Sequence, residues 1–239
     1  MRPDVRRNVL ARRPVRLYRF GVRRILLLAA VLLLVVPGAA GAALRSGASG
    51  KRVRALQLEL AWHGFPSGLV DGRFGPRLTA ALRRFQRSEG LEPDGVAGRS
   101  TLRALSRPLL HSPIPLVWPV LAPVGDGFGP RGHAFHAGID LLAPRGTPVL
   151  AAGPGTVTWA GRRAGGWGRL VVVRHPDGVR TIYAHLASID VHVGDEVSGG
   201  AILGRVGSSG NASGPHLHFE VRVHGAAIDP LGALVPLVG

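Results

Sequence analysis

Apolar residues recur with helical spacing in the first half of the chain, between residues 51 and 107. Val53, Leu56 and Leu60 fall on one face of a predicted helix that ends near Gly64. A second predicted helix begins at Pro76, a residue favoured in first turns, and a short third helix follows it. Inward-facing positions of these two helices are Leu78, Leu82, Phe85, Thr101, Leu102 and Leu105. The spacing predicts a small all-α region of three helices.

The pattern Asp-Gly-x-x-Gly occurs twice in this region, at residues 71–75 and 94–98. Each copy predicts a tight turn that leads into a helix, with aspartate bonding the local backbone and glycine supplying a positive φ. A calcium loop is the alternative interpretation. Neither copy has the alternating oxygen ligands and the distal glutamate of an EF-hand, so the turn is preferred.

From residue 119 to residue 239 the helical spacing gives way to short β-branched runs with frequent glycine. This pattern predicts an all-β region. The runs cover residues 147–150, 156–159, 170–174, 181–183, 191–197, 201–206 and 216–223.

Five prolines lie where the two patterns meet, namely Pro108, Pro113, Pro115, Pro119 and Pro123. Proline disfavours helix interiors and stiffens an extended chain. We therefore expect a proline-rich linker over residues 108–118 between two independent domains, residues 51–107 and 119–239.

Residues 1–42 have the pattern of an export segment. An arginine-rich leader precedes an unbroken apolar run from Ile25 to Val36, and Ala40-Gly41-Ala42 fits a small-residue cleavage pattern. The alternative is an uncleaved membrane anchor, because no charge appears over the 20 residues from Ile25 to Leu44. Either interpretation sends the rest of the chain out of the cytoplasm, to the cell wall or periplasm.

Charge and cysteine content narrow the partners and the chemistry. The formal net charge is +16, and nine of the 30 basic residues precede Ile25. Such a basic chain could meet DNA, acidic lipid or an anionic wall polymer, but export excludes nucleic acid and favours the wall. Contact with a membrane is then expected only through an uncleaved amino-terminal segment. There is no cysteine, so any metal must be held by nitrogen and oxygen.

Eight of the ten histidines fall in the predicted β region. Two histidines and one carboxylate can hold catalytic zinc and leave a position for water. His216 and His218 are two residues apart, so on a strand they leave the same face, and Leu217 between them faces the core. His136 and Asp140 supply a second candidate pair.

The helical region resembles the three-helix peptidoglycan-binding domain found beside many wall hydrolases. The resemblance covers about 55 residues, and the alternative is a structural spacer of the same fold. The matching residues are 53–57, Gly64, 71–75, 80–82, 85–86, 90–91 and 94–98.

The β region resembles the lysostaphin-like, or LytM-type, zinc endopeptidases of the bacterial cell wall, over about 120 residues. The residues that carry this resemblance are 127–131, 136–141, 148–149, 183–186, Gly207 and 214–220. The resemblance implies that His136, Asp140 and His218 hold Zn²⁺ and that His185 and His216 form the catalytic pair. It does not divide the acid and base roles between those two.

The remaining polar residues of the β region receive lesser roles. Glu220 shares a strand face with His218 and is a candidate to orient that ligand. His133 has the wrong spacing for the motif and is expected at the rim of the site. His175, His192 and His224 match no position of the motif and are expected on the surface.

Together these observations predict a two-domain protein, with a small all-α binding domain and an all-β metallopeptidase domain. The expected function is a zinc-dependent endopeptidase that hydrolyses peptide bonds in peptidoglycan stems or cross-bridges. A non-catalytic LytM-like regulator or scaffold of other wall hydrolases is the alternative. A DNA-binding or membrane-surface protein has only the charge in its favour.

Overall fold

The computed structural model describes residues 43–107 and 109–236. All of them belong to the second of two compact units, Gly38–Gly239. The expected export segment, residues 1–42, lies outside the described residues. Among the residues that are described, no helix is both long and apolar enough to cross a membrane.

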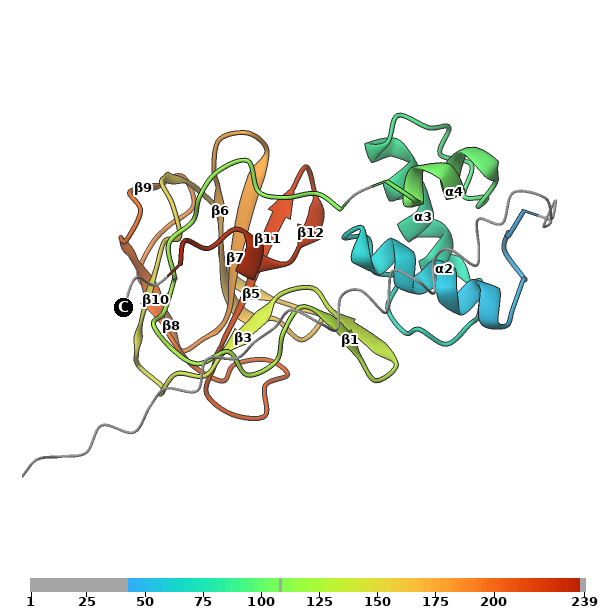
Figure 1. Cartoon of the computed structure of the whole chain (residues 1–239). Helices are drawn as coiled ribbons and strands as arrows, with labels where there is room; N and C mark the ends of the chain where they lie inside the picture. Colours follow the sequence, from blue (N-terminus) through green and yellow to red (C-terminus); the bar gives the residue numbers. More distant parts are fainter. Residues whose placement is uncertain (1–42, 108, 237–239) are drawn as a thin grey trace, which may run out of the picture. The chain divides into compact units, whose positions relative to one another are not determined.

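Three helices form the first region, as the apolar spacing predicted (Figure 1). They are α2 (Lys51–Trp62), α3 (Pro76–Ser88) and α4 (Arg99–Leu105). Leu56, Leu82 and Phe85 are almost fully buried in a shared apolar core, which explains why these short helices are stable in this setting. Pro76 occupies the first turn of α3, where its missing N–H costs nothing.

The two Asp-Gly turns are built alike. The side chain of Gln57 donates to Asp71 Oδ1 at 2.9 Å and accepts from the Gly72 amide at 2.8 Å. Gly72 has a φ of 75°, a conformation that glycine adopts without strain. The predicted local role of aspartate is confirmed, because Asp71 Oδ1 also accepts from the Arg73 amide at 2.9 Å.

The second region consists of antiparallel strands, which confirms the predicted all-β class (Figure 1). Its largest sheet has the order β12-β11-β7-β6-β5-β9, with β3 also paired to β11. These strands are β3 (Ile139–Leu141), β5 (Gly155–Arg163), β6 (Gly168–Arg174), β7 (Val179–Leu186), β9 (Glu196–Val197), β11 (Leu217–Val223) and β12 (Ala226–Ile228).

Smaller sheets complete this region. A hairpin joins β1 (Gly129–Arg131) to β2 (Ala134–His136), and a second small sheet has the order β4-β10-β8. The strands of that second sheet are β4 (Pro148–Leu150), β8 (Ser188–Ile189) and β10 (Ile202–Arg205), and a short 3₁₀ helix, η1 (Pro230–Gly232), follows β12.

The large sheet has two chemically different faces because successive side chains on a strand point in opposite directions. Val171, Tyr183 and Phe219 lie on the face that packs into the main core. Leu217 is also fully buried there, as predicted. The opposite face carries His218 and a smaller apolar cluster made of Leu170, Val172, Ile182 and Ala184.

The second half of the expected linker packs into the β region. Leu116 is fully buried in the main core and forms a parallel bridge with Leu234. The Leu116 amide donates to Ala233 O at 2.9 Å, and Leu116 O accepts from the Val235 amide at 2.8 Å. Residues near 116 therefore belong structurally to the β region.

Candidate metal centre

Three short elements bring the three predicted metal ligands together. Asp140 lies in the middle of β3, and His218 lies directly opposite it on β11. His136 is the last residue of β2, four positions before Asp140. Strand pairing thus joins residues that are far apart in the sequence.

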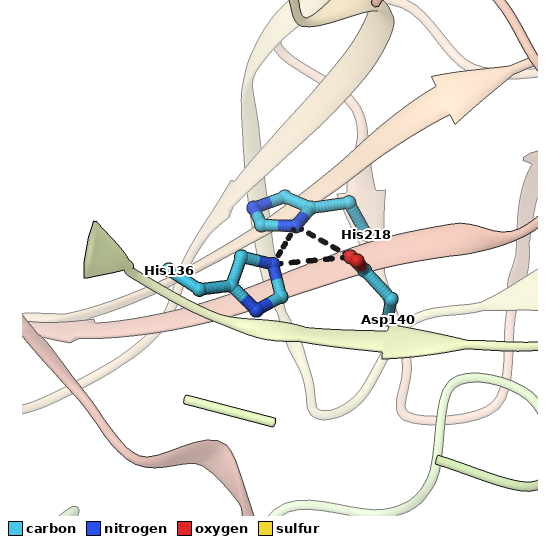
Figure 2. A group of neighbouring side chains, drawn as sticks. All are labelled: His136, Asp140 and His218. Carbon is cyan, nitrogen blue, oxygen red and sulfur yellow. Dashed lines mark hydrogen bonds and ion pairs between the residues drawn. The ribbon is translucent and has the colours of Figure 1, made fainter. Parts of the chain in front are cut away.

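The three side chains point toward one another (Figure 2). His136 Nε2 lies 2.9 Å from His218 Nδ1 and 3.1 Å from Asp140 Oδ1. His218 Nδ1 lies 2.9 Å from the same carboxylate oxygen. All three residues are buried, so water does not solvate this cluster freely.

In each ligand imidazole, one ring nitrogen faces the other two ligands (the inner nitrogen) and one faces away from them (the outer nitrogen). The hydrogen bond made by the outer nitrogen determines whether the inner nitrogen carries a lone pair. His136 Nδ1 lies 2.9 Å from the carbonyl oxygen of Gly127, which can only accept, so this nitrogen donates. His218 Nε2 donates to Glu220 Oε1 at 3.2 Å in the same way. In the neutral imidazoles, the inner His136 Nε2 and His218 Nδ1 are therefore lone-pair atoms.

Arginine and glutamate complete the electrostatics around these ligands. Arg131 bridges Asp140 Oδ2 and Asp126 Oδ2, each at 2.8 Å. Burial acts to raise the pKa of Asp140, but its short contacts with the rings of His136 and His218 and with Arg131 outweigh it and hold that pKa well below its usual range. Asp140 is therefore a carboxylate at neutral pH.

Burial acts to lower the pKa of His218, whereas its interactions with Asp140 and Glu220 raise that pKa to about 9. The site thus holds enough negative charge to attract one cation, either a proton or a metal ion. Charge of this kind beside convergent ligands is typical of metal sites.

His185 and His216 lie beside the three ligands. Their ring centroids are 4.8 Å apart, and the His185 ring lies 5.9 Å from that of His218. His216 Nε2 lies 3.8 Å from Asp140 Oδ1. The five histidine and aspartate positions implied by the sequence therefore form one cluster.

Backbone carbonyl groups orient both of these additional histidines. His185 Nδ1 donates to Ser209 O at 2.8 Å, and His216 Nδ1 donates to Gly214 O at 2.9 Å. His185 also has a φ of 62°, a left-handed conformation that is unusual for a residue other than glycine and is often found at functional sites. In each neutral ring, Nε2 is left free to accept a proton.

Burial lowers the pKa of His185, with further lowering from His216 and His218. A neutral imidazole at physiological pH can accept a proton from a nucleophile. His185 therefore has the protonation state that a general base requires.

The donor set fits zinc. An Nε2, an Nδ1 and a carboxylate oxygen converge, and each imidazole donates its other N–H to a fixed acceptor, as ligating histidines usually do. The fold and the site define the class: a β-sheet protein with two histidines and one carboxylate arranged as a candidate metal site, and two further histidines beside it.

The other predicted positions fall outside this cluster. His133, His192 and His224 are exposed. The expectation that His175 is a surface residue was wrong, because its relative exposure is 5%. His175 lies in hydrogen-bonding range of Pro154 O at 2.7 Å and Thr181 Oγ1 at 2.8 Å, so the interior satisfies both ring nitrogens.

The structure adds residues that the sequence did not identify. Arg131 was noted only as part of a motif, yet it holds Asp140 in place. The ring of Trp167 meets His218 edge-on, with centroids 5.6 Å apart. Glu220, a candidate from strand spacing, does contact His218. An aromatic residue in a glycine-rich loop was the only sequence signal for Trp167.

Comparison with known families agrees with both regions. Residues 134–230 match the model of "Peptidase family M23", and residues 49–105 match the model of "Putative peptidoglycan binding domain". The chain therefore carries a LytM-type M23 peptidase domain together with a peptidoglycan-binding-type domain.

Individual relatives match part of the chain. The DD-carboxypeptidase/endopeptidase Mpg of Neisseria meningitidis serogroup B is 43% identical over 125 residues, which are 51% of this chain and 29% of that protein. The murein hydrolase activator NlpD of Salmonella dublin is 33% identical over 114 residues, 48% of this chain and 30% of that protein. The chain thus spans under a third of the length of either relative.

Among solved structures, the catalytic domain of the antimicrobial peptidase lysostaphin from Staphylococcus simulans is 36% identical, with a TM-score of 0.44. The match covers 46% of this chain and 90% of that chain.

Proposed function

We propose that this protein is a zinc-dependent endopeptidase that hydrolyses peptide bonds in peptidoglycan stems or cross-bridges. Its M23 domain supports a peptidase, and a relative that is 43% identical over 125 residues is named a DD-carboxypeptidase/endopeptidase. The substrate assignment also rests on the peptidoglycan-binding-type domain in the same chain.

One observation carries the catalytic part of this proposal. His136 Nε2, His218 Nδ1 and Asp140 Oδ1 converge within 3.1 Å of one another, and when both rings are neutral none of these three atoms carries a hydrogen. Buried acceptors that face one another without a donor are costly. In the metal-free chain the raised pKa of His218 lets a proton fill this role, and a zinc ion would replace that proton, which is why we assign these three residues as zinc ligands.

Zinc, when bound there, would lower the pKa of a bound water and polarise the scissile carbonyl group. The protein would supply the proton transfers. His185 and His216 each keep Nε2 free because Nδ1 donates to a backbone carbonyl. We assign to this pair the acceptance of the nucleophile's proton and the stabilisation or protonation of the developing tetrahedral centre.

The helical region would hold the polymer while the β region cuts it. We propose residues 51–107 as the binding domain, 108–118 as the linker and 119–239 as the peptidase domain, after an export segment at residues 1–42. Attachment through one domain raises the local concentration of substrate for the other. Relatives named as lipoproteins support a place outside the cytoplasm.

A regulatory role is the second candidate, because a relative that is 33% identical is named a murein hydrolase activator. The complete set of five site residues favours catalysis over this role. A protein that only activates other enzymes has no need of a proton-accepting histidine pair beside its metal ligands.

The test is digestion of purified sacculi by the zinc-loaded chain, followed by mass analysis of the released fragments. We expect zinc-dependent release of peptides with new amino ends, and His216→Ala serves as the matched inactive control. Binding of sacculi of several cross-link types without any release would instead support the regulatory role.

A further inference from the structure

A row of three arginines crosses the metal-bearing face of the large sheet. Arg222 on β11 lies directly opposite Arg180 on β7, and Arg180 lies directly opposite Arg174 on β6. Opposite residues of paired strands share a face, so all three side chains leave the same side of the sheet. We call Arg174, Arg180 and Arg222 the arginine row.

The arginine row shares its face with the metal centre. His218, Glu220 and Arg222 alternate along β11 and therefore point the same way. Arg222 lies four positions after His218, which is about 13 Å along an extended strand. Between them lies the small apolar cluster that contains Ile182 and Val172.

The positive charge of the arginine row is largely uncompensated. Arg222 pairs with Glu220 through contacts of 2.7 Å, and the other oxygen of Glu220 is taken by His218. Arg174 and Arg180 are exposed, and neither forms an ion pair within residues 43–107 and 109–236. One carboxylate therefore serves three guanidinium groups.

This arrangement is unfavourable without a ligand. Like charges directly opposite each other on paired strands repel. The nearby Glu196 carboxylate is bonded to a neutral group instead of an arginine of the row, because it accepts a hydrogen bond from the Thr156 hydroxyl at 2.7 Å. Guanidinium groups bind carboxylates through parallel hydrogen bonds. An anionic ligand that spanned the row would therefore relieve the repulsion and gain several charge-assisted hydrogen bonds.

We propose that the arginine row binds carboxylates of an acidic peptide whose scissile bond lies at the metal centre. This inference rests on the proposed peptidase function and names the class of peptide that the site takes. An extended peptide rises about 3.3 Å per residue, and arginine side chains can reach inward. The carboxylates would then lie about two to four residues from the bond that is cut.

The test uses two peptides that differ only in having free or amidated carboxylates two to four residues from a reduced, non-hydrolysable bond. The affinities of both peptides are measured for the zinc-loaded full chain and for its Arg180→Gln variant. Arg145→Gln, which replaces an exposed arginine in the loop between β3 and β4, is the control. We expect the wild type and Arg145→Gln to bind the free acid about tenfold more tightly, as one charged hydrogen bond allows. Arg180→Gln should bind both forms equally.

Two further measurements keep the inference falsifiable. Loss of discrimination should come without loss of folding, because removal of one like charge from the row should leave the unfolding midpoint unchanged or slightly higher. On hydrolysable peptides the same variant should raise KM and leave kcat nearly unchanged. A fall in kcat with unchanged KM would contradict a binding role.

The outcomes separate this inference from the proposed function. Cleavage of sacculi by a wild type that binds both peptides equally would overturn the inference and leave the peptidase intact. Discrimination between the peptides without cleavage of any substrate would support the arginine row as a binding site and overturn the proposed peptidase function. If short polyphosphate bound in an Arg180-dependent way while the peptides did not differ, the row would bind phosphate polymers and the peptide assignment would be wrong.

Discussion

The helical and β regions each contain a cluster of buried polar side chains, but the two clusters differ in what they leave unpaired. In the helical region, Gln57 and Asp71 bond each other and the adjacent backbone. Gln86 repeats this arrangement with Asp94 Oδ1 at 2.7 Å and the Gly95 amide at 2.9 Å. In both turns the glutamine side chain and the glycine amide are hydrogen-bonded within the turn.

The β cluster has the opposite character. Its outer atoms are fully paired with Gly127, Glu220 and Arg131, whereas its inner atoms are three acceptors that face one another when both imidazoles are neutral. The comparison shows that buried polar residues can either complete a fold or prepare a site. The distinction lies in whether donors and acceptors match within the chain.

The largest expected effect comes from removal of an inner acceptor. His136→Ala and Asp140→Ala should abolish zinc retention and activity, because only two ligands would remain. His185→Ala should keep zinc and lower kcat by about 10²- to 10⁴-fold, as expected for a lost proton acceptor. Metal analysis and turnover of the same samples check this, and equal zinc loss in all three variants would refute the division of roles.

An intermediate effect is expected from the outer shell of the metal centre. Glu220→Gln keeps the shape of the side chain but removes the charge that orients His218. Zinc affinity should fall about 10-fold or more, measured by competition with a chelator. Glu196→Gln, on an exposed carboxylate of β9, is the control and should bind zinc like the wild type.

The helical cluster should respond in stability and not in zinc affinity. Gln57→Leu leaves Asp71 and the Gly72 amide without their side-chain partner, at a cost of about 1–3 kcal/mol. Denaturant unfolding measures this, and Arg54→Gln on the exposed side of α2 should change stability by less than about 0.5 kcal/mol. Reduced zinc affinity in Gln57→Leu would contradict the claim that the helical cluster contributes to stability alone.

The smallest effect concerns Glu59, a partly buried carboxyl in α2. Burial raises the pKa of Glu59 from 4.5 to about 7. The folded state then binds more protons than the unfolded state between these values, so stability should fall as pH rises from about 4.5 to 7 and change little above that. Allowing for solvent screening, the loss should be about 1 kcal/mol.

Replacement of Glu59 by glutamine supplies the test of that pH dependence. Glu59→Gln cannot ionise, so the unfolding free energy of this variant should lack the decline between pH 4.5 and 7. If the wild type and Glu59→Gln lost stability in parallel over this range, another group would be responsible.

Local patterns predicted the helical region well because its contacts are local. The spacing of Val53, Leu56 and Leu60 located α2, and the Asp-Gly turns were correctly identified. The five site residues were also predicted, because each lies in a sequence motif that resembles those of the LytM-type peptidases.

The features that sequence reasoning missed depend on strand register. His175 was placed on the surface because it matches no motif position, and nothing in the sequence indicated that Pro154 and Thr181 would lie beside its ring. The arginine row depends likewise on how β6, β7 and β11 align, because a shift of one residue would move Arg180 to the other face. Hydrophobic alternation predicts strands but not this alignment.

Return of zinc to the chelator-treated chain tests the central claim most directly. Release of new amino ends from sacculi should be absent without metal and rise linearly to a plateau at about one zinc per chain, as a single three-ligand site requires. His185→Ala should take up the same zinc and release almost nothing. Release that persists in the metal-free chain, or a zinc-loaded wild type that releases nothing, would contradict the account.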